Sequence, residues 1–159
     1  MNYEIGDKVV HWTHGTGRIV AIDEKDIAGT THQYYVVDTG NLTLWVLIDA
    51  TGETSIRPPT ESFEFKALVN SLRSPGNTLP DRHFERKNQL EERMRKRKLV
   101  DVCGVIRDLT ARSRLHNLNY NDRSVLRQAE ECLLDEWEIS LGSTRSSALH
   151  DLGVLLGNG

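Results

Sequence analysis

Hydrophobic and polar residues alternate along the first third of the chain in short stretches separated by turn-prone residues. The stretches are rich in Val, Ile, Tyr and Trp, which favour strands. They comprise Ile5 and residues 9–12, 18–22, 33–38 and 42–48, with turn signals such as Ala28-Gly29 and Thr39-Gly40-Asn41 between them. Because the stretches recur about every ten residues without a helical pattern between them, they predict antiparallel strands in a small β-barrel or strongly curved sheet.

The period of the hydrophobic pattern changes after residue 60. Pro58 and Pro59 end the β region, because a proline cannot donate a ladder hydrogen bond and restricts the residue before it. Apolar residues then recur at the i, i+3, i+4 spacing of helices with one buried face, and Phe63 and Phe65 are expected on such a face. The predicted helices span residues 62–73, 82–97, 99–109, 123–141 and 147–156.

The second of these helices is unusual because its only apolar residues are Phe84, Leu90 and Met94. We therefore expect it to be largely solvated, with Asp81 as its N-cap. For the helix over residues 123–141, Asn121 or Asp122 is the expected N-cap.

These patterns predict an α+β protein, with an N-terminal small β-barrel or curved antiparallel sheet followed by an all-α C-terminal domain. The predicted boundaries are a β domain over residues 1–60, a linking helix and loop over 61–80, and a helical domain over 81–156. A chain of 159 residues is long enough for two such small domains, each with a modest core.

The net charge is small but unevenly distributed. With 20 Lys and Arg against 23 Asp and Glu, the total argues weakly against a dedicated nucleic-acid binder. However, residues 1–65 carry 4 basic and 10 acidic side chains, whereas residues 81–114 carry 11 basic and 6 acidic ones. The acidic β region suits a protein partner and the basic segment suits DNA. The apolar runs are far shorter than the roughly 20 residues of a membrane span, so we expect a cytoplasmic protein without membrane contact.

Candidate catalytic and metal-binding motifs fail on their context. Residues 14–17, His-Gly-Thr-Gly, lie between two strands, so they predict a hairpin turn and not a phosphate loop, which must open onto a helix N-terminus. His11 and His14, three apart on a strand, would point to opposite faces and could not share a metal. Cys103 and Cys132 are expected to be buried free thiols. The sequence thus predicts a protein that is not an enzyme and has no cofactor or metal.

Two features favour macromolecular partners. The cations of residues 93–98, with Arg82, Arg86 and Lys87 before them, could follow DNA phosphates, or they could form a solvated helix face paired with nearby glutamates. Strand alternation places Trp45 with Thr43 and Leu47, on the face opposite the core-like Leu42, Leu44, Val46 and Ile48. Trp45 is therefore expected to be half covered, or to contact a partner.

Residues 6–19 (GDKVVHWTHGTGRI), 27–29 (IAG) and 34–37 (YYVV) resemble the opening of the CarD family of bacterial transcription regulators. The N-terminal domain of that family is shared with transcription-repair coupling factor. Residues 90–92 (LEE), 105–109 (VIRDL) and 121–134 resemble the helical domain of the same family. The resemblance covers about residues 3–141.

This resemblance implies a non-enzymatic factor whose Tudor-like β domain binds the RNA polymerase β subunit. Lys25 and Ile27 match positions near the polymerase-facing edge, and Trp45 occupies a place where family members often have Arg. With Thr43 they form the expected polymerase-binding set. The helical domain would contact promoter double-stranded DNA at the upstream edge of the bubble and steady the open complex.

The resemblance also implies which residues contact DNA. Family members commonly carry a Trp wedged into the minor groove at the start of the first basic helix; here His83 takes that place, with Phe84 expected in the core. The expected DNA-binding residues are Arg82, His83, Arg86, Lys87, Arg123 and Arg127. Since an imidazole has less stacking area than an indole, and Gln128 stands where the family often has Lys, we expect weaker DNA contact than in a typical member.

We expect a monomer that associates with the nucleoid through RNA polymerase. The principal alternative is an adaptor that binds RNA polymerase without touching DNA, and a metal-dependent or thiol enzyme is a distant third. Salt sensitivity separates the first two, because phosphate contacts make affinity fall steeply with salt.

Overall fold

The computed structural model describes residues 2–49, 51 and 54–157. The chain folds into two compact units, Met1–Pro59 and Thr60–Gly159. The first is a β unit and the second a helical unit, which confirms the predicted α+β class. No helix in the described part of the chain is long and apolar enough to cross a membrane.

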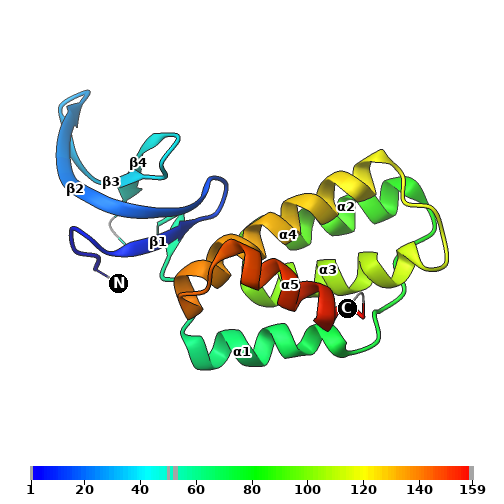
Figure 1. The fold of residues 1–159 in the computed structure, drawn as a ribbon. Helices are drawn as coiled ribbons and strands as arrows, with labels where there is room; N and C mark the ends of the chain where they lie inside the picture. The colour runs from blue at the N-terminus through cyan, green and yellow to red at the C-terminus, as the bar shows by residue number, and fades with distance from the viewer. Residues whose placement is uncertain (1, 50, 52–53, 158–159) are drawn as a thin grey trace. The chain divides into compact units, whose positions relative to one another are not determined.

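The β unit is an open antiparallel sheet of five strands in the order β4-β3-β2-β1-β5 (Figure 1). The strands are β1 Lys8–His11, β2 Gly15–Ile27, β3 Thr30–Asp38, β4 Thr43–Ile48 and β5 Ile56–Arg57. In the described residues β4 and β5 each pair with one neighbour, so the sheet does not close and the barrel alternative is wrong. The curved-sheet alternative is correct: the register between β2 and β3 shifts between Ile19 and Ala21, and such a bulge bends a strand.

The longest hairpin extends beyond the predicted strands. β2 continues to Ile27 and β3 begins at Thr30, joined by Ala28 and Gly29, both with positive φ as in the tight turn that suits a two-residue hairpin. Ile5, predicted to be in a strand, lies in an exposed turn before β1. The hairpin turn predicted over residues 14–17 lies earlier, at residues 12–14, because residues 15–17 already pair with β1 as the start of β2. In this turn His11 Nδ1 accepts hydrogen bonds from the backbone amides of Thr13 and His14.

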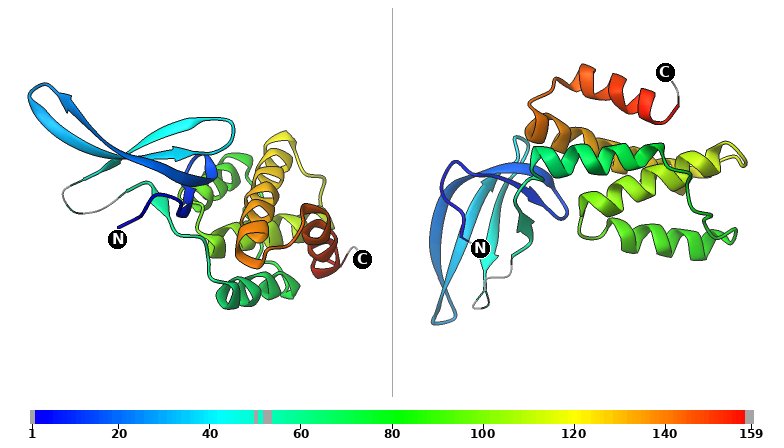
Figure 2. Two further views of the ribbon diagram at one scale, coloured as in Figure 1. Left: turned by 60° about the vertical axis from the view of Figure 1, so that its left-hand side comes forward. Right: turned by 90° about the horizontal axis from the view of Figure 1, so that it is seen from below.

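The helical unit contains every predicted helix, with shifted ends. The elements are α1 Ser62–Asn70, the 3₁₀ turn η1 Ser71–Arg73, α2 His83–Met94, α3 Leu99–Ser113, α4 Tyr120–Leu141 and α5 Arg145–Leu155. Helix α3 is central, and its buried residues include Val105, Ile106 and Leu109. Helices α1, α2 and α4 pack against it, and Figure 2 shows the helical unit from two further sides.

Residues 61–80, expected to link the domains, belong to the helical unit. Phe65 of α1 is fully buried edge-on against Trp137 of α4, with ring centroids 5.5 Å apart. The backbone N–H and hydroxyl of Thr60 both donate to Glu136 Oε2, at 2.8 and 2.6 Å. The boundary between units therefore falls at Pro59, because the chain enters the helical core directly after the prolines.

The predicted helix caps and two aromatic positions need correction. The N-cap of α4 is Asn119, not Asn121 or Asp122, and that of α2 is Arg82, because the Asp81 carboxylate pairs with Arg112 at 3.3 Å. Phe63 and Phe84, expected to be buried, are 87% and 70% exposed.

Candidate protein-binding edge and nucleic-acid interface

Strand β4 forms one edge of the β unit. It pairs with β3 from Asp38↔Thr43 to Gln33↔Ile48, and no strand in the described residues covers its other side. An edge strand exposes a row of unpaired backbone N–H and C=O groups that can accept a strand from a partner. The β4 edge is therefore a candidate surface for strand addition.

A cation lies over the exposed aromatic side chain of this edge. The Nζ atom of Lys25 is 4.4 Å from the ring centroid of Trp45 and 5.9 Å from that of Tyr34. Trp45 is 47% exposed, which confirms the half-covered side chain expected from alternation. The Lys25 ammonium covers part of the indole and leaves the rest accessible, giving a flat apolar surface with a positive charge beside it.

The expected polymerase-binding residues of β2 and β4 share one face of the sheet, but only Lys25 and Trp45 are in contact. Ile27 pairs with Thr30 and Thr43 with Asp38, at opposite ends of β3. Thr43 and Trp45 are two apart on β4, and Lys25 and Ile27 are two apart on β2, so each pair shares a strand face. Since Lys25 covers Trp45, all four face the same side of the sheet. Tyr34 joins them and was missed, because only the register of β3 against β4 places it beside Leu47.

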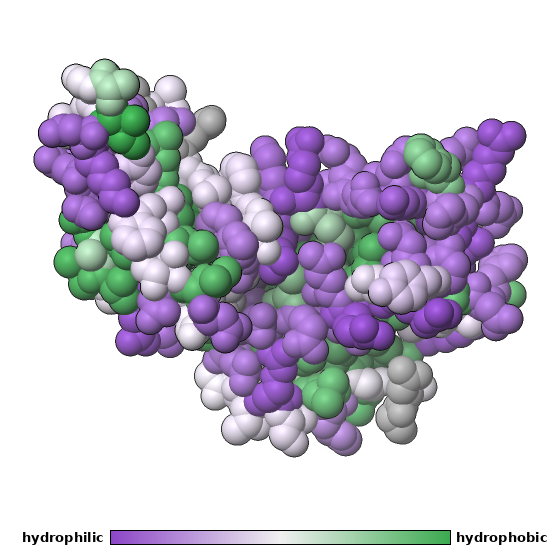
Figure 3. All heavy atoms as spheres, turned by 90° about the horizontal axis from the view of Figure 1, so that it is seen from above, coloured by the Kyte–Doolittle hydropathy of each residue, from purple (hydrophilic) through white to green (hydrophobic). Residues whose placement is uncertain are grey.

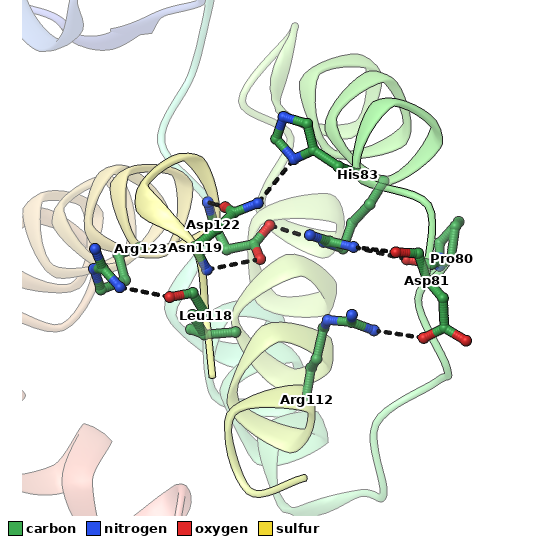
Figure 4. Close-up of polar contacts among 9 residues, drawn as sticks. Pro80, Asp81, His83, Arg112, Leu118, Asn119, Asp122 and Arg123 are labelled. Atoms are coloured by element: carbon green, nitrogen blue, oxygen red, sulfur yellow. Dashed lines mark hydrogen bonds and ion pairs between the residues drawn. The ribbon is translucent and has the colours of Figure 1, made fainter. Parts of the chain in front are cut away.

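The starts of α2 and α4 are tied together by the cap of α4. Asn119 Oδ1 accepts a hydrogen bond from the Asp122 amide at 2.8 Å, which directs the Asn119 side-chain N–H₂ toward His83 (Figure 4). That group lies 2.8 Å from His83 Nδ1. Because an amide nitrogen can only donate, Nδ1 is the acceptor and the ring carries its proton on Nε2. We call this region the α2–α4 junction, defined by His83, Asn119 and Asp122.

Arg86 does not face solvent, in contrast to the expectation that it contacts phosphate. The residue is 5% exposed, and its Nε donates to Asp122 Oδ1 at 2.9 Å. Its Nη1 donates to the carbonyls of Pro80 and Asp81 at 3.1 and 3.0 Å (Figure 4). Arg86 thus joins the loop before α2 to the cap of α4 beneath the junction, and it is unavailable to a DNA backbone in this arrangement.

A second cation of the basic segment is also used internally. Arg93 Nη2 donates to the buried Asp108 carboxylate at 2.9 Å. The same carboxylate accepts hydrogen bonds from Arg107 Nε and from the backbone N–H of Asn77. The expected stripe of Arg82, Arg86 and Arg93 is therefore not a continuous row of free charges, because two of the three neutralise buried carboxylates.

The remaining expected cations are accessible around the junction. Arg82 precedes His83 and is exposed, and Lys87 is partly exposed. Arg82 Nη1 lies 3.8 Å from Glu85 Oε1, and Lys87 Nζ lies 3.9 Å from Glu91 Oε1. Arg123 and Arg127 are exposed one turn apart on α4, just after Asn119. Seen from above, the side of the helical unit that carries α2 and α4 is mostly hydrophilic (Figure 3). These four cations are the accessible part of the expected DNA-binding set.

Two large aromatic residues are exposed beside the same junction. Phe84 follows His83 at the start of α2, and Tyr120, which is 82% exposed, follows Asn119 at the start of α4. Tyr120 was not among the DNA-binding residues expected from the sequence. The helix was predicted to begin at residue 123, so Tyr120 was assigned to the turn before it. Aromatic faces next to cations suit contact with unstacked bases.

The described residues offer little for catalysis. Cys103 is buried, and burial together with the nearby Glu136 raises the pKa of its thiol to about 12, so the thiolate nucleophile is scarce at neutral pH. Cys132, also a free thiol as predicted, is only half buried. No group of three or more His, Cys, Asp and Glu side chains that could hold a metal ion occurs within residues 2–49, 51 and 54–157.

Comparison with known proteins matches both units, in order. The family described as "CarD-like/TRCF RID domain" matches residues 3–58, and the family described as "CarD, C-terminal domain" matches residues 67–152, more than half of the chain. The Bacillus subtilis (strain 168) protein named "Putative transcription factor YdeB" is 27% identical over 146 residues, which cover 89% of this chain and 94% of YdeB. The two matched ranges fall within the β unit and the helical unit, respectively.

Proposed function

The chain belongs to the CarD family of non-enzymatic transcription regulators that interact with RNA polymerase, and we propose how its two units divide that work. The β unit binds the polymerase β subunit, and the helical unit contacts promoter double-stranded DNA near the upstream edge of the bubble. Bound in this way, the protein changes the stability of the open complex.

The observation that carries this proposal is the presence of both domains in one chain. The first domain is shared with transcription-repair coupling factor, so alone it implies only a polymerase contact. The second domain separates this chain from that class of protein. A regulator that binds polymerase and DNA at once needs two separate surfaces, and each unit offers one.

The β4 edge and the Lys25–Trp45 contact support the polymerase assignment. Strand addition would satisfy the exposed backbone groups of β4, and burial of Trp45 would add apolar contact. The β region is acidic, so DNA would be repelled there and contact with a protein is favoured.

The α2–α4 junction supports the DNA assignment. Arg82, Lys87, Arg123 and Arg127 would contact phosphates, while His83, Phe84 and Tyr120 would meet bases at the edge of the bubble. His83 keeps an accessible Nε2–H donor because its Nδ1 is occupied by Asn119. Arg86 does not contact DNA in this proposal; instead it positions the α2–α4 junction through its bonds to Asp122, Pro80 and Asp81.

Reversal of the two α4 cations tests the phosphate contacts. We expect Arg123→Glu with Arg127→Glu to weaken promoter binding by about tenfold for each phosphate that is no longer bound. The slope of log affinity against log salt should shrink by about 0.9 per phosphate. Lys66→Glu with Arg73→Glu, which reverses two exposed cations of α1 and η1 outside the expected DNA-binding set, is the matched control. The measurement is the lifetime of the polymerase open complex, with promoter affinity at several salt concentrations.

Two outcomes of that experiment would count against the proposal. Wild-type protein that is not retained by RNA polymerase would remove the polymerase contact. Retention with lifetime and salt slope unchanged in the Arg123/Arg127 double variant would instead favour the adaptor that does not touch DNA. The observation that favours this alternative is that Arg86 and Arg93 pair with Asp122 and Asp108 within the helical unit.

Removal of the exposed aromatic rings tests the base contacts separately. We expect Phe84→Ala and Tyr120→Ala to shorten the open-complex lifetime, because stacking on a base contributes about 1–3 kcal/mol. The salt slope should stay unchanged, since no charge is removed. Phe63→Ala, which removes an equally exposed ring from α1, is the control. Lifetimes equal to that of the control would remove both rings from the interface.

A further inference from the structure

A groove between α1 and α5 lies within the helical unit. It has a volume of about 400 Å³ and is lined by α1, η1, the end of α4, and α5. Helices α1 and α5 each pack against α4, and they run side by side in the view from below (Figure 2, right). Because both rest on α4, the α4 surface between them forms the bottom of the groove.

The bottom of this groove is apolar. Val69 of α1, Trp137 of α4 and Leu155 of α5 line it, and Val154 beside them is 41% exposed. An apolar groove of this size on a surface favours an apolar side chain from a ligand, because filling it removes both surfaces from water. A phosphate backbone would find no positive charge at the apolar bottom of the groove.

The charges around the groove have a definite arrangement. Lys66 and Arg73 line the side of α1 and η1, seven residues apart, which is two helical turns or about 10 Å. Asp151 lines the side of α5. All three side chains are exposed and form no ion pair with any of the residues that the structure describes. The groove thus has two free cations along one wall and a free carboxylate on the other.

We propose that this α1–α5 groove binds an amphipathic helix of another protein. Apolar anchors spaced three or four residues apart enter the groove over Trp137, as in helix-in-groove recognition. Two carboxylates about two turns apart on the ligand helix meet Lys66 and Arg73, and a cation on its other flank meets Asp151. The spacing of the two cations favours a helical ligand, because positions seven apart on a helix fall on one face.

A second copy of the chain fits these features less well. Stable protein interfaces bury about 1,200–2,000 Å² in total, and the short helix α1 offers a groove only a few turns long. A single amphipathic helix is matched to that length. The inference concerns a protein partner distinct from the surfaces proposed for polymerase and DNA, so it stands or falls independently of them.

A display selection with the full chain tests this inference. The library consists of helical peptides of about 16 residues in which all positions of one face and its flanks are randomised. Peptides that bind the wild-type protein are kept, and those that also bind the Val154→Asp variant are removed. We expect the surviving peptides to carry apolar anchors and an acidic flank, and to bind Val154→Asp at least tenfold more weakly than wild type. Leu149→Asp, at an exposed position of α5 outside the groove, is the control and should bind as wild type does.

Charge exchange then tests the orientation. Peptides in which the acidic flank is replaced by Lys should bind wild type at least tenfold more weakly and regain affinity for the Lys66→Glu/Arg73→Glu variant. Selection of no groove-dependent peptides, or of peptides without acidic bias, overturns the proposal. A dimer in sedimentation experiments that Val154→Asp dissociates would also overturn it, in favour of a second copy as the occupant.

Discussion

Replacing Asp122 with alanine is expected to lower the free energy of unfolding of the helical unit by about 3–5 kcal/mol. Asp122 is almost fully buried and pairs with Arg86, whose side chain is also buried. Without the carboxylate, the guanidinium keeps only the carbonyls of Pro80 and Asp81 and remains a buried charge without a counter-ion. The same substitution removes half of the capping box at the start of α4.

The measurement is urea unfolding of the full chain, followed by helical circular dichroism. Asp101→Ala removes a carboxylate from the first turn of α3 and is the control; it should cost only about 0.3–1 kcal/mol through the helix dipole. In Arg86→Met/Asp122→Ala the unpaired charge is gone, so we expect part of the stability to return. A destabilisation by Asp122→Ala no larger than that of the control would show that the pair does not hold the junction.

Arg86 also predicts a functional difference. If Arg86 positions the junction, Arg86→Met should lower stability while leaving the salt slope of DNA binding unchanged. A phosphate-contacting arginine would do the opposite, because its removal would reduce the slope without destabilising the fold. The two readouts therefore separate the buried role seen in the structure from the phosphate contact expected from sequence.

The burial of Arg86 could have been read from the pattern of α2. The buried residues of that helix are Arg86, Leu90 and Met94, spaced by four, so Arg86 lies on the packing face where an apolar residue would normally be. Its partner Asp122 is 36 residues away, and no local signal identifies that pairing. A cation within a charged run looks solvated until the neighbouring helix supplies a carboxylate.

The same periodicity explains the two misplaced phenylalanines. On α1 the buried residues are Phe65 and Val69, and Phe63 lies two positions before Phe65, about 200° around the helix. On α2, Phe84 lies six positions before Leu90, again off the packing face. The sequence analysis placed Phe63 on the periodic apolar face of its helix and Phe84 in the core, whereas the phase set by the buried residues places both rings outside.

The strands were predictable where one face is buried and not elsewhere. The segments around Ile19, Val37 and Val46 alternate against the core of the β unit and were found. The outer part of the β2–β3 hairpin carries Asp23, Glu24, Lys25 and Asp26, all of them exposed, so no alternation marks it. Lys25 lies near Trp45 because of the registers in which β2 and β4 pair with β3. Those registers could not be predicted from the hydrophobic pattern of this segment.

Trp45→Ala is expected to weaken binding to the polymerase β subunit by about 2–4 kcal/mol, or about 30- to 1,000-fold. The indole is the largest exposed apolar side chain on the β4 edge, and its neighbours Thr43 and Leu47 would surround it within an interface. Leu42→Ala removes a similarly exposed side chain at the start of the same segment and is the control. The measurement is affinity for the isolated RNA polymerase β subunit, and a value for Trp45→Ala within twofold of the control would exclude Trp45 as an anchor.

Trp45→Arg distinguishes apolar burial from ion pairing at the same position. The resemblance to the family places an Arg there in many members, so a polymerase carboxylate opposite this site would favour the substitution. In this chain, however, Lys25 Nζ lies only 4.4 Å from the ring of Trp45, and an introduced guanidinium would meet a like charge. We therefore expect Trp45→Arg to bind weakly and Lys25→Ala/Trp45→Arg to recover affinity. Full affinity in Trp45→Arg alone would show that the contact is ionic, and that Lys25 and Trp45 do not act as a pair.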